Sequence, residues 1–387
     1  MRIFVLSVFL FLSGCSSVPS DTNTTKLILS DAPFVTSNAE VVFEEQVFAL
    51  TPEQQADFMR FYEKKRSQGK NAHQAVSDFL LAKLNNFSYF GETYTASEAM
   101  AHSKGNCMSL AILTTALANL VGVEYGYREV STLPVFEKHS GLLLSSSHVQ
   151  TKLFEPISED AEKFSIFVRD GILIDYFPDS NNIKGQYLKY PQFLAKFYVN
   201  KASDALIEKR IDEAFAYARA AYDQAHDSPE VLNILAVIYR RQGEEQEAER
   251  IYQHAVSLAP NNISLLSNYL VLLERQGRQA EAGTILTKMA QLDDPNPYSW
   301  LDQAYLAKSQ GKNRQAITYF KKTIELAPYV KPAYVGLYNI YMEKGQETLA
   351  KNTLSRALEW THGTKERQQL KYKLYGRNAA VEVLESE

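Results

Sequence analysis

Residues 243–260 read GEEQEAERIYQHAVSLAP, and the order of small and large residues in this stretch returns at a fixed interval. The interval is 34 residues, as shown by four glycines: Gly243, Gly277, Gly311 and Gly345. An alanine follows each glycine five residues later: Ala248, Ala282, Ala316 and Ala350. A fixed period of this length is typical of a repeat array.

Two further positions of the unit share this period. The first is a large apolar residue: Tyr252, Leu286, Phe320 and Leu354. The second is mostly small: Ala255, Met289, Thr323 and Ala357. The same interval before Gly243 falls on Lys209, with Ala214 and Ala221 behind it, so we expect a degenerate first repeat.

Each unit is expected to form a helix, a turn at the glycine and a second helix, because small alanines let two helices approach closely. The pattern resembles the tetratricopeptide repeat, over about residues 195–364 and about five repeats. The resemblance implies an all-α superhelix whose concave face binds a protein or peptide partner. Residues 365–387 would follow as a helix or tail.

Aromatic residues are frequent in this region, and they either line the concave face or pack inside the array: Tyr269, Tyr298, Trp300, Tyr305, Tyr334, Tyr338 and Tyr341. Helical spacing of aromatics favours packing. Three histidines, His226, His254 and His362, are expected at the surface without a metal role, because they share no ligand spacing.

The overall composition is that of a globular protein. Of the 387 residues, 45% are hydrophobic and 22% are charged, which argues against a disordered chain. The formal net charge is -4, so we expect no broad basic surface for nucleic acid.

The first residues have the layout of a secretory signal. Arg2 precedes an apolar run, residues 3–12, which is too short for a membrane span of about 20 residues. The sequence then reads Leu12-Ser13-Gly14-Cys15, which resembles a bacterial lipobox. The resemblance implies a signal peptide over 1–14 and lipidation of Cys15. The residues that follow are rich in Ser, Thr, Asp and Pro, so a lipidated tether is expected over 15–40. The alternative is an ordinary signal peptide cut nearby.

The lipobox resemblance also implies a location. A lipidated Cys15 would anchor the protein in the membrane of a bacterial cell envelope. The residue after Cys15 is Ser16 rather than aspartate, which favours the outer membrane, facing the periplasm.

Only one other cysteine, Cys107, is present. If Cys15 carries lipid, Cys107 is the only free thiol. A lone thiol in an oxidising envelope is either reactive or a small buried residue, and its context has to decide. Asn106-Cys107 opens a long apolar helix that Gly122 stops, which places Cys107 in the first helical turn. A thiol there is expected to have a lowered pKa and to act as a nucleophile.

The region before the repeats, residues 41–190, mixes helices and strands. Helices are expected from Thr51 to about Arg66, over 71–84 and after Thr95. After Gly122 the pattern predicts strands over 123–130, 140–144, 147–154, 165–168 and 172–177, with Asp170-Gly171 as a turn. A helix with a nucleophile against an antiparallel sheet is the papain-like plan.

Gly105-Asn106-Cys107 and its helix resemble the nucleophile motif of transglutaminase-like cysteine enzymes. The resemblance implies an α+β fold in which His148 is the base and Asp175 orients it. His139 is the main rival for the base and is expected in an exposed loop. Asp170 is expected in a turn, and Asp179 is an outside rival for the acid.

These features leave two functions open. The first is a thiol enzyme that acts on amide bonds, as a peptidase or in acyl transfer or deamidation, with the repeats recruiting a partner. The alternative is a catalytically inactive scaffold for protein assembly. No zinc spacing and no phosphate-binding glycine loop is present in the sequence, so neither a metal nor another cofactor is implied.

Overall fold

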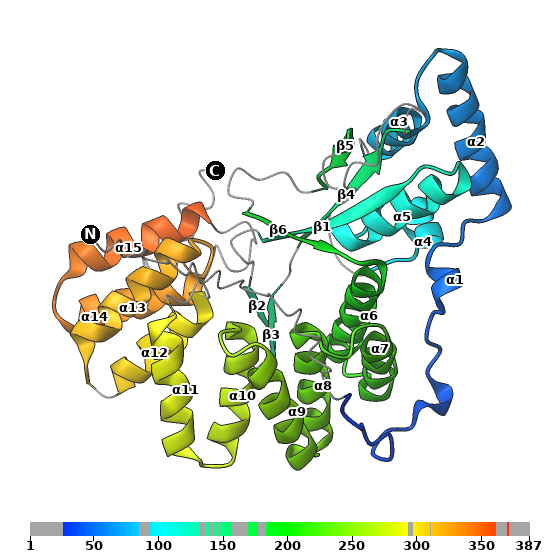
Figure 1. Cartoon of the computed structure of the whole chain (residues 1–387). Helices are drawn as coiled ribbons and strands as arrows, with labels where there is room; N and C mark the ends of the chain where they lie inside the picture. The colour runs from blue at the N-terminus through cyan, green and yellow to red at the C-terminus, as the bar shows by residue number, and fades with distance from the viewer. Residues whose placement is uncertain are drawn as a thin grey trace, which may run out of the picture.

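The computed structural model describes residues 26–84, 93–131, 136–139, 142–145, 148–156, 169–176, 183–292, 297–309, 311–360 and residue 370. Cys15, the predicted signal peptide 1–14, Asp179, His362 and the predicted tail (apart from residue 370) lie outside these residues. The described chain forms a helical and β-sheet region that continues into a long array of helix pairs (Figure 1).

The chain enters through a short 3-10 turn, Thr36–Asn38, and a one-turn helix, α1 (Glu44–Val47). Helix α2 (Pro52–Ser67) begins as the sequence predicts, because the Thr51 hydroxyl caps the Gln54 amide and proline occupies the first turn. Helix α3 (Ala72–Leu84) packs against α2 through Phe79, whose ring meets the edge of Phe58 at 5.1 Å.

Helix α4 (Ala96–His102) begins with the expected capping box, in which Thr95 and Glu98 bond one another's main-chain amides. The next helix, α5 (Cys107–Leu120), is apolar on all sides, and every residue from 108 to 118 is buried. A helix without a polar face belongs in the centre of a fold. Helix α5 is therefore the core of this region, with α3, α4 and the sheet around it.

The sheet has four antiparallel strands in the order β5-β4-β1-β6. They are β1 (Tyr125–Ser131), β4 (His148–Phe154), β5 (Gly171–Ile174) and β6 (Ile183–Leu188). Strands β2 (Phe136–His139) and β3 (Leu142–Ser145) form a separate hairpin. The expected combination of helices and an antiparallel sheet is confirmed.

Two of the described strands were not predicted from the sequence. The sequence pattern missed β6, whose alternation Ile183-Lys184-Gly185-Gln186 is too weak to show a buried face. It also missed β2: His139 lies at the end of this strand rather than in an exposed loop, because residues 136–139 pair with β3. The strand predicted over 165–168 lies outside the described residues.

Ten helices form five consecutive pairs, from residue 190 to residue 359. They are α6 (Tyr190–Ile207), α7 (Ile211–Gln224), α8 (Pro229–Gln242), α9 (Glu245–Leu258), α10 (Ile263–Arg275), α11 (Gln279–Gln291), α12 (Pro297–Ser309), α13 (Asn313–Leu326), α14 (Lys331–Glu343) and α15 (Glu347–Glu359). The pairs stack side by side and bend into an arc (Figure 1).

The turns inside the pairs explain the 34-residue period. Gly243, Gly277, Gly311 and Gly345 all have positive φ, between 69° and 97°, which an L side chain rarely adopts. Lys209 occupies the same place in the first pair, and its φ is also positive, at 64°. The degenerate first repeat therefore keeps the turn geometry without the glycine.

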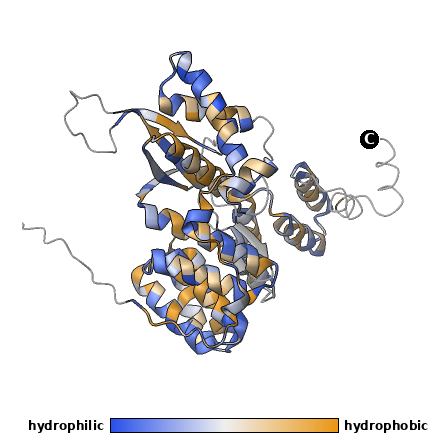
Figure 2. Ribbon diagram, turned by 90° about the vertical axis from the view of Figure 1, so that its right-hand side faces the viewer, coloured by the Kyte–Doolittle hydropathy of each residue, from blue (hydrophilic) through white to orange (hydrophobic). Residues whose placement is uncertain are grey.

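The alanines of the period lie in the seams between helices. Ala214, Ala248, Ala316 and Ala350 are completely buried. Gly336 serves the same purpose between α13 and α14, because a Cβ there would stand 2.3 Å from the Phe320 ring. Figure 2 shows hydrophobic colour on the faces that the helices turn toward one another and hydrophilic colour outside.

The apolar interior divides into two clusters. The first is continuous from the N-terminal residues through α5 and the sheet to Ala282 in α11. The second begins at Leu301 in α12 and holds the last two helix pairs together. Among the described helices, none has the length and apolarity needed to cross a membrane.

Candidate functional site

Cys107 is the first residue of α5, as predicted. The side chain of Asn106 caps the helix by accepting a hydrogen bond from the Ser109 amide at 3.0 Å. Gly105 has a φ of 147°, and a Cβ there would stand 2.7 Å from that of Ser109. The turn before Cys107 therefore requires glycine. Thr93 fastens the turn from outside, because its hydroxyl oxygen accepts a hydrogen bond from the side-chain amide of Asn106 at 2.8 Å.

The thiol of Cys107 lies where α5 meets strand β4. It is partly buried, and the main-chain amide of Val149 donates a hydrogen bond to it. Burial raises the pKa of the Cys107 thiol. The Val149 amide, the amides at the start of α5 and the charge of Lys196 oppose this effect only in part. The expected lowering of this pKa is therefore wrong in direction: loss of water outweighs the helix terminus.

His148 is the residue directly before Val149 and the first of β4. Its main chain pairs with Val130 at the end of the β1–β4 ladder. The described part of the structure does not include its side chain. The rival, His139, pairs with Leu142 in the separate hairpin, so the two histidines belong to different sheets.

Asp175 directly follows β5, the neighbour of β4. Its carboxylate accepts a hydrogen bond from the side-chain amide of Gln150 at 2.7 Å. Gln150 is only 4% exposed and stands two residues after His148. Asp170 is exposed, and its main-chain carbonyl accepts from the Glu155 amide at 3.0 Å, as expected of a turn residue.

The main chain thus brings three elements together. Helix α5 supplies Cys107, β4 supplies His148, and the end of β5 supplies Asp175. Cys107 accepts a hydrogen bond from Val149, the residue directly after His148. Asp175 accepts one from Gln150, two residues after His148. The order and the proximity of the three positions suit a cysteine, a base and an orienting acid. Their roles stay a prediction.

Lys196 is a buried charge that the sequence did not reveal. It lies on α6 with its side chain 12% exposed, and it forms ion pairs with Glu129 of β1 at 2.9 Å and Glu230 of α8 at 2.5 Å. Burial opposes the charge of Lys196, but the two carboxylates outweigh burial and raise its pKa. This group joins the sheet to the first two helix pairs beside Cys107.

The N-terminal strap, residues 26–43, lies along helices α7, α8 and α9 (Figure 1). The Phe34 ring lies flat on Phe215 of α7 and meets the edge of Tyr239 of α8 at 5.2 Å. Four tyrosine hydroxyls of the array donate to main-chain carbonyls of the strap: Tyr198, Tyr217, Tyr222 and Tyr239.

The strap changes the interpretation of the predicted tether. Polar composition predicts a tether over residues 15–40, but residues 26–40 are packed on the array. The reason is that Leu29 and Phe34, both at most 8% exposed, supply apolar anchors within a polar stretch. The first residues of that tether, 15–25, lie outside the described chain.

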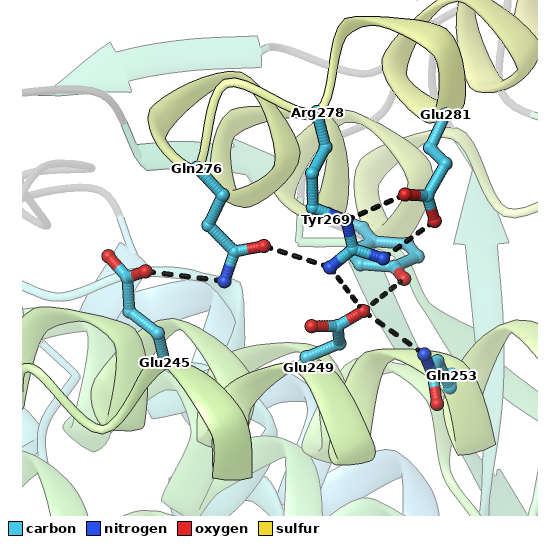
Figure 3. Close-up of polar contacts among 7 residues, drawn as sticks. All are labelled: Glu245, Glu249, Gln253, Tyr269, Gln276, Arg278 and Glu281. Carbon is cyan, nitrogen blue, oxygen red and sulfur yellow. Dashed lines mark hydrogen bonds and ion pairs between the residues drawn. The ribbon is translucent and has the colours of Figure 1, made fainter.

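A polar junction fixes the second and third helix pairs to one another (Figure 3). Arg278, which directly precedes α11, donates to Glu281 of that helix and to Glu249 of α9, each at 2.6 Å. Gln276 reaches Glu245 of α9 at 3.2 Å. These contacts join the turn between α10 and α11 to α9.

Two of the histidines that were expected at the surface, His226 and His254, are only half-exposed. His226 meets the edge of the Tyr222 ring at 6.3 Å, and His254 is partly buried on α9. Among the described residues, no three His, Cys, Asp or Glu side chains are grouped to hold a metal ion. Most of the described aromatics of the array pack inside it, whereas Tyr305 of α12 is 43% exposed.

The helix pairs match a known family. A tetratricopeptide repeat model matches residues 186–294, and a second tetratricopeptide repeat model matches residues 297–329. The C-terminal part of the chain is therefore an array of tetratricopeptide repeats, and such repeats imply protein partners. Neither model reaches the residues before 186, so the transglutaminase-like resemblance stays a prediction.

Solved structures give likenesses over about half of the chain. PilF of Pseudomonas aeruginosa is 19% identical, with 50% of this chain and 90% of that chain covered and a TM-score of 0.41. PilW, described as a widely conserved type IV pilus biogenesis factor, is 21% identical over 49% and 89%, with a TM-score of 0.38. MamA of Desulfovibrio magneticus is 17% identical over 43% and 94%, with a TM-score of 0.32. No curated protein matches the chain.

Proposed function

We propose that this protein is a scaffold whose tetratricopeptide array binds a protein or peptide partner. The observation that carries the proposal is the regular stack of five helix pairs with positive-φ turns and buried alanine seams. Such stacks present extended curved surfaces for other chains. The N-terminal region supports the array through the strap and the Lys196 ion pairs.

The two apolar clusters allow a clean test of this function. A chain that ends at residue 292 keeps the first cluster and loses the last two helix pairs together with the residues that follow them. We expect this truncation to abolish the cellular phenotype of the protein, whereas Cys107→Ala leaves it intact. An intact phenotype in the truncated chain and a lost one in Cys107→Ala would reject the scaffold.

The arrangement around Cys107 favours a second candidate function, a thiol enzyme acting on amide bonds. In this proposal His148 takes the thiol proton, Cys107 attacks the carbonyl carbon, and the proton passes to the departing amine. Water then releases the acyl group in hydrolysis or deamidation, or a second amine takes it in acyl transfer. Asp175 orients the imidazole, and main-chain amides at the start of α5 stabilise the oxyanion.

This second function is supported by the contact between the Cys107 thiol and the Val149 amide, and by the bond from Gln150 to Asp175. Its test is a fluorogenic peptide library incubated with the protein and with Cys107→Ser. Turnover that disappears in Cys107→Ser establishes the activity. Equal background turnover by both proteins rejects it for this class of substrate.

We also propose that Cys15 carries lipid and holds the protein on the outer membrane of a bacterial envelope, facing the periplasm. The support is the stretch Leu12-Ser13-Gly14-Cys15 behind an apolar run, with Ser16 after the cysteine. Cells grown with an alkyne-labelled fatty acid should label the protein, and Cys15→Ser should remove the label. Equal labelling of both proteins would contradict the anchor.

A further inference from the structure

The β2–β3 hairpin is an arm that leaves the sheet and reaches the repeat array. Strand β1 ends at Ser131, the arm occupies residues 136–145, and β4 begins at His148. The arm is not a member of the four-stranded sheet; its two strands pair with one another, from Phe136 with Ser145 to His139 with Leu142.

The arm lies against the array at two helices. Strand β3 contacts α10, and β2 contacts α12. These are the first helices of the third and fourth pairs. In Figure 1 the arm stands on the inner side of the arc, between the four-stranded sheet and α10. The chain thus places its own segment on the surface where a repeat array takes its partners.

The arm is also joined closely to the thiol region. Two residues separate Ser145, the last of β3, from His148, the first of β4. His148 and Val130 are the last pair of the β1–β4 ladder, and the arm lies between them in the chain. The next residue, Val149, donates its amide to Cys107. The arm is therefore followed in the chain, after two residues, by the strand that contacts the thiol.

We propose that the arm is an internal occupant of the inner face at α10 and α12, and that the partner is an extended apolar segment that takes its place. This proposal rests on the scaffold function and names the partner class and the regulation of that surface. When the partner displaces the arm, the start of β4 moves and the Cys107 thiol becomes more accessible. Partner binding and thiol accessibility are therefore linked.

The chemistry of the arm defines the partner. Strand β3 reads Leu142-Leu143-Leu144-Ser145 and carries no charge. Among the described residues, the arm has no third strand, and β3 contacts α10. A segment that competes with β3 at α10 needs the same features: four or more residues in extended conformation, mostly leucine-like and uncharged. Extended segments are a common ligand form because alternate side chains can enter separate pockets.

The first test is competition in trans. The probe is a fluorescent peptide of residues 136–145, and the two proteins are the full chain and a variant in which these residues become alternating glycine and serine. Each carries Cys15→Ser, so Cys107 is the only cysteine. We expect the peptide to bind the variant about tenfold more tightly, which corresponds to an arm docked about 90% of the time. A peptide with all three leucines replaced by serine is the control.

The second test measures the link to Cys107. We expect iodoacetamide to alkylate Cys107 several-fold faster in the arm variant than in the full chain. If circular dichroism shows that the variant is unfolded, Leu143→Asp replaces it, because a charge disfavours docking without altering the length of the arm. Equal alkylation rates overturn the link.

Peptide affinities that are equal for both proteins, or an absence of binding to the variant, overturn the occupancy of the inner face. The scaffold function fails separately, when removal of the last two helix pairs leaves the cellular phenotype unchanged. The two failures are therefore distinguishable.

Discussion

The ring of Phe34 lies flat against the ring of Phe215, with centroids 3.8 Å apart and planes 4° from parallel. The two residues are far apart in the chain, and their contact fixes the N-terminal strap on the first repeat. Phe34 is 7% exposed and Phe215 is 1% exposed, so this pair is part of the interior. The strap is therefore a component of the array and shares its first apolar cluster.

Replacing Phe34 by alanine should destabilise the protein by about 3–5 kcal/mol, the usual cost of removing a buried aromatic ring. Urea unfolding measures this loss, and protease cleavage within residues 26–43 shows whether the strap detaches first. Val35→Ala is the matched control, because Val35 is adjacent but 63% exposed. Equal effects of the two substitutions would show that the strap is not anchored at Phe34.

The first repeat offers a stabilising substitution. Lys209 holds a φ of 64° at the turn where the later repeats have glycine. A non-glycine residue in this conformation costs about 1–2 kcal/mol, and glycine costs about 0.5–1 kcal/mol through the unfolded chain. Lys209→Gly should therefore raise the free energy of unfolding by about 0.5–1 kcal/mol.

The control for this turn is Gly243→Ala, which places a side chain at a φ of 97° with open space around its Cβ. It should lower the free energy of unfolding by about 1 kcal/mol from backbone strain alone. A destabilising Lys209→Gly would mean that the lysine side chain contributes more than its strain costs.

The contributions of Lys196, Glu129 and Glu230 to stability should depend strongly on one another. Lys196→Met leaves Glu129 and Glu230 without their cation in a mostly buried place, at a cost of about 3–5 kcal/mol. Adding Glu129→Gln and Glu230→Gln to Lys196→Met should recover much of this loss. Thermal unfolding of the single and triple variants measures the coupling, and an unchanged single variant would contradict it.

The Lys196 ion pairs also make the free energy of unfolding depend on pH. The folded state raises the pKa of Lys196, so it holds the proton more tightly than the unfolded chain does. The stability that this proton contributes is fully present below the ordinary lysine pKa of about 10.4 and is lost as the pH rises above it. Lys196→Met should flatten the fall of stability between pH 10 and 11. A curve identical to that of the parent would exclude the linkage.

Alkylation of Cys107 distinguishes the two candidate functions. Burial raises the pKa of this thiol, so its apparent pKa by iodoacetamide should exceed the free-thiol value of about 8.5. His148→Ala should leave this value unchanged if the thiol is merely buried. An apparent pKa below about 8.5 that rises in His148→Ala would instead establish a thiolate–imidazolium pair and favour the enzyme.

Features that depend on residues close together in the chain were predicted well from the sequence. The 34-residue period was visible because each turn needs a positive φ, which favours glycine, and each seam needs a small residue. Cys107 was placed at a helix start because Asn106 is a good cap and the residues after it are apolar. The capping threonine at Thr51 and the capping box at Thr95 were predictable for the same reason: the groups that they bond lie three residues away.

Contacts between residues far apart in the chain could not be predicted from the sequence. Tyr222 bonds a carbonyl 195 residues away in sequence, and Lys196 meets carboxylates on two other elements. Neither contact leaves a periodic or spaced pattern in the chain. The thiol pKa was predicted with the wrong sign because the sequence places Cys107 at a helix terminus but does not show how completely the surrounding protein removes water.

The sequence by itself determined the repeat array, the start of the central helix and the order of Cys107, His148 and Asp175, because these depend on neighbours within one or two turns or on order alone. Only the tertiary structure decided that the strap packs on the array, that Lys196 bridges the sheet to the repeats, and that the β2–β3 arm lies against α10 and α12. Each of these depends on which distant surfaces meet, and that choice minimises exposed apolar area and unpaired charge over the whole chain.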